Sequence, residues 1–189
     1  MFVRFDYLKC LEAAGVLLST TEIRTMGRMR LLKLLYLANR KSLIESGDPI
    51  VDDDAVAMAA GPVLSHTYDL IKGTEANARA QAAWKEYFED VRPYLLRMVA
   101  EPGTDHLSDY DVKTLKNTAD EFKDMEDFDL SEYTHQFDEW RRNWDGKHNV
   151  APISAHDLLS AIGYTEQEIT GALKEARSLA SEQDLLGCR

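Results

Sequence analysis

The sequence has little cysteine, no long apolar run and no glycine-rich phosphate loop, and each absence excludes a class of protein. Only two of its 189 residues are cysteine, Cys10 and Cys188, so we expect reduced thiols rather than a disulfide-stabilised extracellular fold. Its apolar runs are far shorter than the roughly 20 residues of a membrane-spanning helix. The amino terminus lacks the cleavage pattern of an export signal, which favours a cytoplasmic protein.

Histidine is also sparse, and its spacing predicts no metal site or cofactor. None of the histidines is separated from another by the three residues of a helical metal motif. Ser65, His66 and Asp69 lie close together, but a helix would point His66 away from Ser65, so we expect no catalytic triad. The five histidines are His66, His106, His135, His148 and His156.

Acidic charge is concentrated in the middle of a chain whose net charge is -11. Residues 101–139 contain thirteen Asp or Glu and three Lys, whereas residues 1–47 contain eight Lys or Arg and four acids. A strongly acidic surface repels phosphate backbones, so nucleic acid is not expected to be the main ligand. The distribution favours a basic protein as partner.

Helical patterns predict a mainly α fold, with residues 1–189 forming a single compact domain. Apolar residues recur at helical spacing over residues 5–19, and a second helix is expected to end at Gly47. The centre of that second helix is apolar on almost every side apart from Lys33, which indicates a buried helix. A further helix is predicted over residues 165–186.

Two segments depart from the helical pattern. In "PYLLRMVAEPGTDHL", residues 93–107, a β-capable run precedes a turn, which predicts a small β-hairpin or an extended excursion. Gly61-Pro62 interrupts a long apolar stretch. Glycine accepts unusual backbone angles and proline fits the first helical position, so this pair predicts a hinge and a helix from Pro62 to about Lys72.

The second half of the chain contains three helix starts of the capping-box form. In each, a hydroxyl and an acid three residues later can satisfy the free amides of the first turn. The stretch "DLSEYTHQFDEWRRNW", residues 129–144, predicts one further helix. The capping pairs are Ser108 with Asp111, Ser154 with Asp157, and Thr165 with Glu168.

The acidic segment, residues 120–129, has the sequence "DEFKDMEDFD" and permits two interpretations. It can be a solvated helix end and loop, as most charge runs are. It can also be an electrostatic contact surface for a basic partner, with Asp124, Glu126 and Asp127 as its contacts. A calcium loop is not expected, because the central glycine and closing glutamate are absent.

The order of the motifs resembles the Panacea domain family, which includes SocA-like antitoxins and phage-associated relatives. "LLKLLYLANRKSLIESGDPIVDDDAVAMAAGPVLSHTYDLIKG", residues 31–73, looks like the opening signature of that family. "LSDYDVKTL" and "LSEYTHQFDEW" resemble later segments, and the likeness is strongest over residues 26–153. Ala60 and Asn39 depart from the residues that the family commonly carries.

The resemblance implies a mostly helical antitoxin that neutralises a cognate toxin by binding it directly. In the SocA-like branch it also implies an adaptor that delivers the toxin to the ClpXP protease. The residues themselves predict no catalytic residue, cofactor, metal or membrane segment. The motif residues that stand as candidates for partner binding or for structural roles are Tyr36, Gly61, Pro62, Val63, Tyr68, His135 and Trp140.

Two other functions remain open from the residues alone. A small enzyme could use His135 with a nearby carboxylate, although no nucleophile accompanies it. The acidic surface could instead imitate nucleic acid and block a DNA-binding protein. The oligomeric state does not follow from the sequence.

Overall fold

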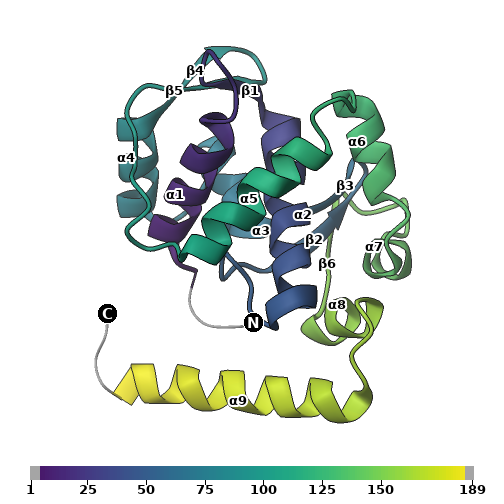
Figure 1. Ribbon diagram of the computed structural model, residues 1–189. Helices are drawn as coiled ribbons and strands as arrows, with labels where there is room; N and C mark the ends of the chain where they lie inside the picture. Colours follow the sequence, from purple (N-terminus) through teal and green to yellow (C-terminus); the bar gives the residue numbers. More distant parts are fainter. Residues whose placement is uncertain (1–4, 186–189) are drawn as a thin grey trace.

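The computed structural model describes residues 5–185, in which helices pack together with two small antiparallel sheets (Figure 1). This mainly α architecture confirms the predicted fold class. The helices are α1 (Tyr7–Leu18), α2 (Arg28–Ser46), α3 (Ser65–Lys72), α4 (Ala78–Tyr87), α5 (Asp109–Glu121), α6 (Asp127–Thr134), α7 (Asp138–Asn143), α8 (Ala155–Ala161) and α9 (Glu166–Leu185). The strands are β1 (Thr25–Gly27), β2 (Ala55–Met58), β3 (Gly61–Leu64), β4 (Phe88–Arg92), β5 (Leu95–Met98) and β6 (Val150–Pro152).

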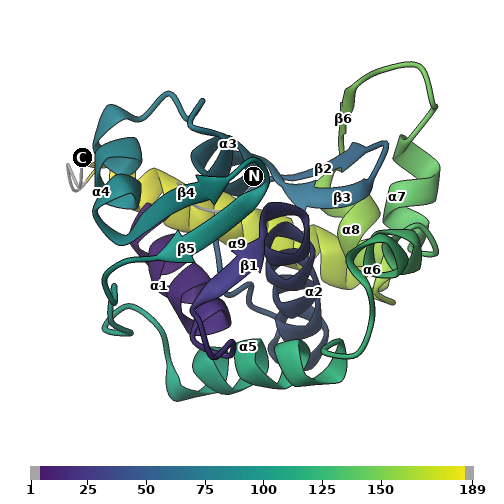
Figure 2. The same ribbon diagram turned by 90° about the horizontal axis from the view of Figure 1, so that it is seen from above.

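Helix α2 is the central element, and it packs against α1, α5, α6 and β3 (Figure 2). Residues 31–39 are buried without interruption, as expected for a helix that is apolar on almost every side. The helix ends where Gly47 adopts a left-handed conformation with φ 84°, a conformation that glycine adopts at little cost. The predicted second helix is therefore confirmed, including its capping residue.

The first sheet has the order β1-β5-β4 and contains the predicted hairpin. That hairpin is β4–β5 and spans residues 88–98, so the expectation of a hairpin over residues 93–107 was correct in kind and wrong in position. Residues 99–107 form no strand. Instead they lie against α1, where Pro102 packs on Gly15 and His106 binds the buried Glu12 carboxylate.

The second sheet has the order β3-β2-β6 and corrects the prediction that Pro62 opens a helix. Pro62 lies within β3, paired with Ala57 of β2, and α3 begins only at Ser65. Proline cannot donate a ladder hydrogen bond, but β3 is an edge strand, where one side of the backbone needs no donor. Gly61-Pro62 therefore begins β3, directly after the tight Ala59-Ala60 turn.

The predicted helix over residues 129–144 is broken into α6 and α7. Helix α6 ends at Thr134, whose hydroxyl bonds back to the Ser131 carbonyl at 2.7 Å. The indole Nε1 of Trp140 donates to the Met58 carbonyl at 2.9 Å and ties α7 to strand β2. This tertiary bond fixes a direction for α7 that local periodicity does not contain.

The three predicted helix starts are confirmed by hydrogen bonds at α5, α8 and α9. Ser108 and Asp111 form a reciprocal capping box, and Thr165 and Glu168 bond in the same way. The side chain of Ser154 accepts a hydrogen bond from the amide of Asp157.

Helix α9 confirms the expected carboxyl-terminal helix, of which residue 186 lies outside the described part, as does Cys188. It runs along the outside of the body and packs on α8 (Figure 1). Its side chain Ile169 is 1 % exposed and anchors its first turns. Within residues 5–185, no helix combines the length and the apolarity needed to cross a membrane.

Candidate functional site

Motif residues that are far apart in the sequence meet around the β2–β3 turn. Ser131 of α6 donates to the Ala60 carbonyl at 2.6 Å, and Trp140 of α7 donates to Met58. Gly61 lies between them. We call this arrangement of α6 and α7 around residues 58–61 the turn clasp.

Gly61 packs so closely in the turn clasp that it has no room for a side chain. A Cβ on Gly61 would lie 2.2 Å from Thr134 Oγ1, 2.9 Å from Lys33 Nζ and 3.3 Å from His135 Cδ2. Its φ of +94° also belongs to the region that favours glycine. Gly61 is therefore required by both sterics and backbone conformation.

Lys33 is a buried cation inside the turn clasp, with a side chain that reaches from α2 to β3. The residue is 1 % exposed, and its Nζ donates to the Pro62 carbonyl at 2.8 Å. Burial lowers the pKa of Lys33 from 10.5 to about 7, because the charged amine loses its water. The sequence signal for this residue was its position as the one charge in the apolar centre of α2.

His135 is held between an aromatic ring and a carboxylate. Its ring stacks on Trp140 with centroids 4.1 Å apart, and its Nδ1 lies 3.2 Å from Glu132 Oε1. Its Nε2 is buried without a hydrogen-bond partner among the described residues. Within that part of the chain no serine or cysteine bonds to this ring, so the contacts describe a packed histidine rather than an activated nucleophile and base.

A second buried polar centre lies one turn further along α2. The carboxylate of Glu139, which is 0 % exposed, accepts from Tyr36 Oη at 3.0 Å and from Arg40 Nε at 2.7 Å. Burial and the adjacent carboxylate hold the pKa of Tyr36 well above its usual value. Glu139 was missed from the sequence because it stands in an acidic stretch that resembles a solvated helix face.

Most of the motif residues singled out from the sequence are inside the protein. Tyr36, Pro62 and Val63 are buried, and they organise α2 and β3 rather than face solvent. Tyr68 is half-buried on α3, where Lys72 Nζ lies 4.9 Å from the centre of its ring. Tyr68 is not part of the turn clasp.

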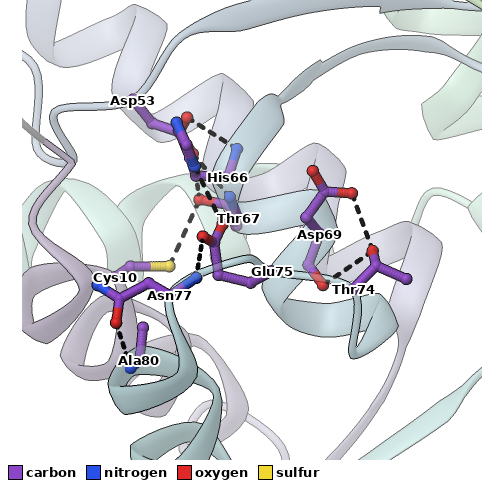
Figure 3. Close-up of polar contacts among 9 residues, drawn as sticks. All are labelled: Cys10, Asp53, His66, Thr67, Asp69, Thr74, Glu75, Asn77 and Ala80. Carbon is purple, nitrogen blue, oxygen red and sulfur yellow. Dashed lines mark hydrogen bonds and ion pairs between the residues drawn. The ribbon is translucent and has the colours of Figure 1, made fainter.

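A third polar network joins α1, the segment that precedes β2, and α3 (Figure 3). Asp53 Oδ1 accepts from the amide of His66 at 3.0 Å, and its Oδ2 accepts from the amide and hydroxyl of Thr67 at 2.8 and 2.7 Å. Cys10 Sγ lies 3.4 Å from the same hydroxyl, and burial raises the pKa of its thiol to about 12. A thiol held in its neutral form is a poor nucleophile.

The side chains of the sequence trio Ser65, His66 and Asp69 do not form a triad. His66 Nδ1 lies 3.0 Å from Glu75 Oε2, and Asp69 accepts from the Thr74 hydroxyl (Figure 3). Within the described residues, moreover, no three His, Cys, Asp or Glu side chains gather in a way that could hold a metal ion.

Arg30 of α2 anchors the acidic segment to the body of the protein. The guanidinium donates to the carbonyls of Phe122 and Met125 and pairs with Asp127 at 2.9 Å. Asp127 is therefore paired within the protein although its side chain is partly exposed, whereas Asp124 and Glu126 are exposed. Arg30 positions the acidic segment, and the sequence contains no local sign of that contact.

Beside the acidic segment lies an open groove with a volume of about 230 Å³ between α2, α5 and the α6–α7 junction. Its lining is mixed, with aromatic and aliphatic side chains at the base and charged side chains at the edges. Within the described residues it is framed by Leu37, Arg40, Lys41, Ile44, Glu45, Thr118, Glu121, Phe122, Tyr133 and Phe137. We call it the α2–α5 groove.

These features define a helical protein whose motif residues stabilise a rigid frame and whose grooved, acidic surface is open. The family model for the antitoxin SocA-like, Panacea domain matches residues 31–141. The chain belongs to this family. No curated protein and no solved structure is significantly similar to it. The matched range includes most of α2, the residues whose hydrogen bonds form the turn clasp, and the residues that line the α2–α5 groove.

Proposed function

We propose that the chain is an antitoxin that neutralises a cognate toxin by direct protein–protein binding, and that it acts without catalysis. Membership of the SocA-like antitoxin family carries this proposal. The geometry supports it, because the polar centres around Lys33 and Glu139 are closed and buried. Such buried centres fix the arrangement of the helices around them, which suits a surface that binds another protein.

The proposal extends to proteolysis. Bound toxin is delivered to the ClpXP protease, with the antitoxin acting as the adaptor. The support for this step is the likeness to the SocA-like branch, and it makes neutralisation dependent on the protease as well as on binding.

Co-expression with the product of the adjacent reading frame tests the proposal. We expect the neighbour alone to arrest growth, co-expression to restore it, and the two proteins to co-purify. In cells that lack ClpX, the toxin should persist while the complex still forms. A harmless neighbour, or one that never binds, contradicts the antitoxin function.

A His135→Ala variant separates binding from catalysis. In a binding protein, replacing a histidine that stacks on Trp140 lowers the melting temperature, and neutralisation falls only as far as folding does. Loss of neutralisation with an unchanged melting temperature and undiminished binding of the adjacent gene product would support the enzyme hypothesis instead.

A further inference from the structure

The α2–α5 groove presents side chains of the kind that anchor protein interfaces. Ile44 is 49 % exposed at its edge, although it is a large aliphatic residue. Beneath it, the Tyr133 ring packs against two phenylalanine rings. Its centroid lies 5.1 Å from that of Phe122 and 5.7 Å from that of Phe137. Aromatic residues and arginine at the base of a groove are typical of binding hot spots.

The side chains at the base and edge of the groove are held by contacts within the chain itself. Arg40 lies 4.2 Å above the Phe137 ring and is fixed from the other side by the buried Glu139 carboxylate. Lys41 and Glu121 form an ion pair across the groove, from α2 to α5. A preorganised surface loses little conformational entropy on binding.

The acidic segment continues from the groove wall, since Glu121 and Phe122 belong to both. Its ten residues contain six acids and one lysine, a net charge of -5. Three of these acids are in ion pairs with Lys123, Lys41 and Arg30. Three exposed acids extend beyond the groove, namely Asp124, Glu126 and Asp129.

Phe128 adds an exposed aromatic side chain among these acids. It is 69 % exposed near the start of α6. An apolar ring bordered by acids is complementary to a surface that combines an apolar recess with Lys or Arg. Binding of a second copy at this position would bring two acidic segments together, which is electrostatically unfavourable.

We propose that the α2–α5 groove and the acidic segment form the toxin-docking surface, and that its occupant is a basic amphipathic segment of the toxin. A large apolar side chain of that segment fills the groove beside Ile44, and its Lys or Arg residues face Asp124, Glu126 and Asp129. This inference rests on the proposed function, since it names the surface through which that function operates.

The test measures the affinity of the co-purified adjacent gene product for two variants of the chain. Ile44→Glu places a charge in the groove, and Asp124→Lys/Glu126→Lys reverses the flanking charge. We expect each to weaken affinity by about tenfold or more. The loss in the charge variant should shrink as salt rises, because exposed charges are screened.

Matched controls come from surfaces away from the groove. Val150→Glu charges an apolar residue of similar exposure, 46 %, on β6. Glu86→Lys/Asp105→Lys changes the net charge by the same amount as the test pair, and α4, which carries Glu86, lies on the other side of the molecule from α6 (Figures 1 and 2). Both controls should bind within about twofold of wild type.

The outcomes separate the two proposals. If wild type does not bind the adjacent gene product, the antitoxin proposal fails. If wild type binds, and if Ile44→Glu and Asp124→Lys/Glu126→Lys both bind as tightly as wild type, the antitoxin proposal stands and the docking surface is wrong. A dimer of the chain alone that Ile44→Glu converts to monomer would also overturn it. Melting temperatures identify any variant that fails to fold. If Ile44→Glu fails to fold, the Asp124→Lys/Glu126→Lys variant, which changes exposed residues, decides whether the docking surface is correct.

Discussion

At the scale of the residue, Gly61 shows how one position joins three elements. It stands at the start of β3, with Lys33 of α2 and Thr134 of α6 beside the position that a Cβ on Gly61 would occupy. Each of these neighbours is itself fixed, Lys33 by the Pro62 carbonyl and Thr134 by the Ser131 carbonyl. A side chain at Gly61 would therefore displace the turn clasp, since the atoms around it are held by hydrogen bonds.

We expect Gly61→Ala to lower the free energy of unfolding by about 4 kcal/mol, from backbone strain plus overpacking. Gly73→Ala is the matched control, because Gly73 also has a positive φ, +80°, but nothing lies within 4 Å of its added Cβ. The control should lose only the strain, about 1.5 kcal/mol. Urea denaturation of both variants measures the difference, and equal losses would refute the close packing at Gly61.

At the scale of the element, α3 depends on a residue outside its own sequence. Its N-cap position is Leu64, which makes no side-chain capping bond. Asp53, from the segment before β2, supplies the missing acceptors to the amides of His66 and Thr67. An acidic group at a helix amino terminus also interacts favourably with the helix dipole. Tertiary structure thus supplies to α3 the cap that its own sequence lacks.

Replacing this remote cap should cost more than replacing a local one. We expect Asp53→Ala to lower the free energy of unfolding by about 2 to 3 kcal/mol, because three hydrogen bonds to a carboxylate are lost. Ser108→Ala, which removes the local cap of α5, should cost about 1 kcal/mol. Thermal and urea unfolding compare the two, and an Asp53→Ala loss no larger than that of Ser108→Ala would contradict the assignment.

At the scale of the whole molecule, α2 links the two sheets and the turn clasp. Its amino-terminal end follows β1 directly, Lys33 reaches β3, and Tyr36 and Arg40 reach α7. Helix α9 differs, because it lies along the outside and packs on α8 (Figure 1). Stability of the body therefore depends on the contacts of α2.

The buried Lys33 makes this stability depend on pH. Its folded pKa of about 7 lies below its ordinary value of 10.5, so between these values the folded protein binds fewer protons than the unfolded chain. The contribution of Lys33 to stability therefore increases as pH rises from 7. His66 and His106 act in the opposite direction, because their raised pKa values remove stability as pH rises above 6.5.

The Lys33→Met variant isolates this effect. Relative to Lys33→Met, wild type should gain up to about 1.4 kcal/mol of unfolding free energy per pH unit between pH 7 and 9. Urea titrations at each pH measure the difference between the two curves, in which the histidine contributions cancel. Lys85→Met, at an exposed lysine of α4, serves as control. A flat difference between wild type and Lys33→Met would show that Lys33 titrates as it does in the unfolded chain.

Local patterns predicted the helices well and the candidate site poorly. The buried α2, its Gly47 end and the capping boxes follow from interactions within a few residues, so the sequence contains them. The hairpin was displaced to residues 88–98, Pro62 lies in a strand, and residues 129–144 form two helices, because partners distant in sequence decide each case. The groove was not predicted, since its walls come from separate helices.

The amino-acid sequence by itself determined that the chain is mainly helical, that its acidic charge lies in the middle, and that its motifs belong to an antitoxin family. Periodicity, capping and charge are properties of neighbouring residues, so they can be recognised in the sequence without knowledge of the fold. The tertiary structure alone decided that Lys33, Gly61 and Thr134 meet, and that Glu139 is buried beside Tyr36 and Arg40. Those contacts join residues that are distant in sequence, and only packing in three dimensions can select them.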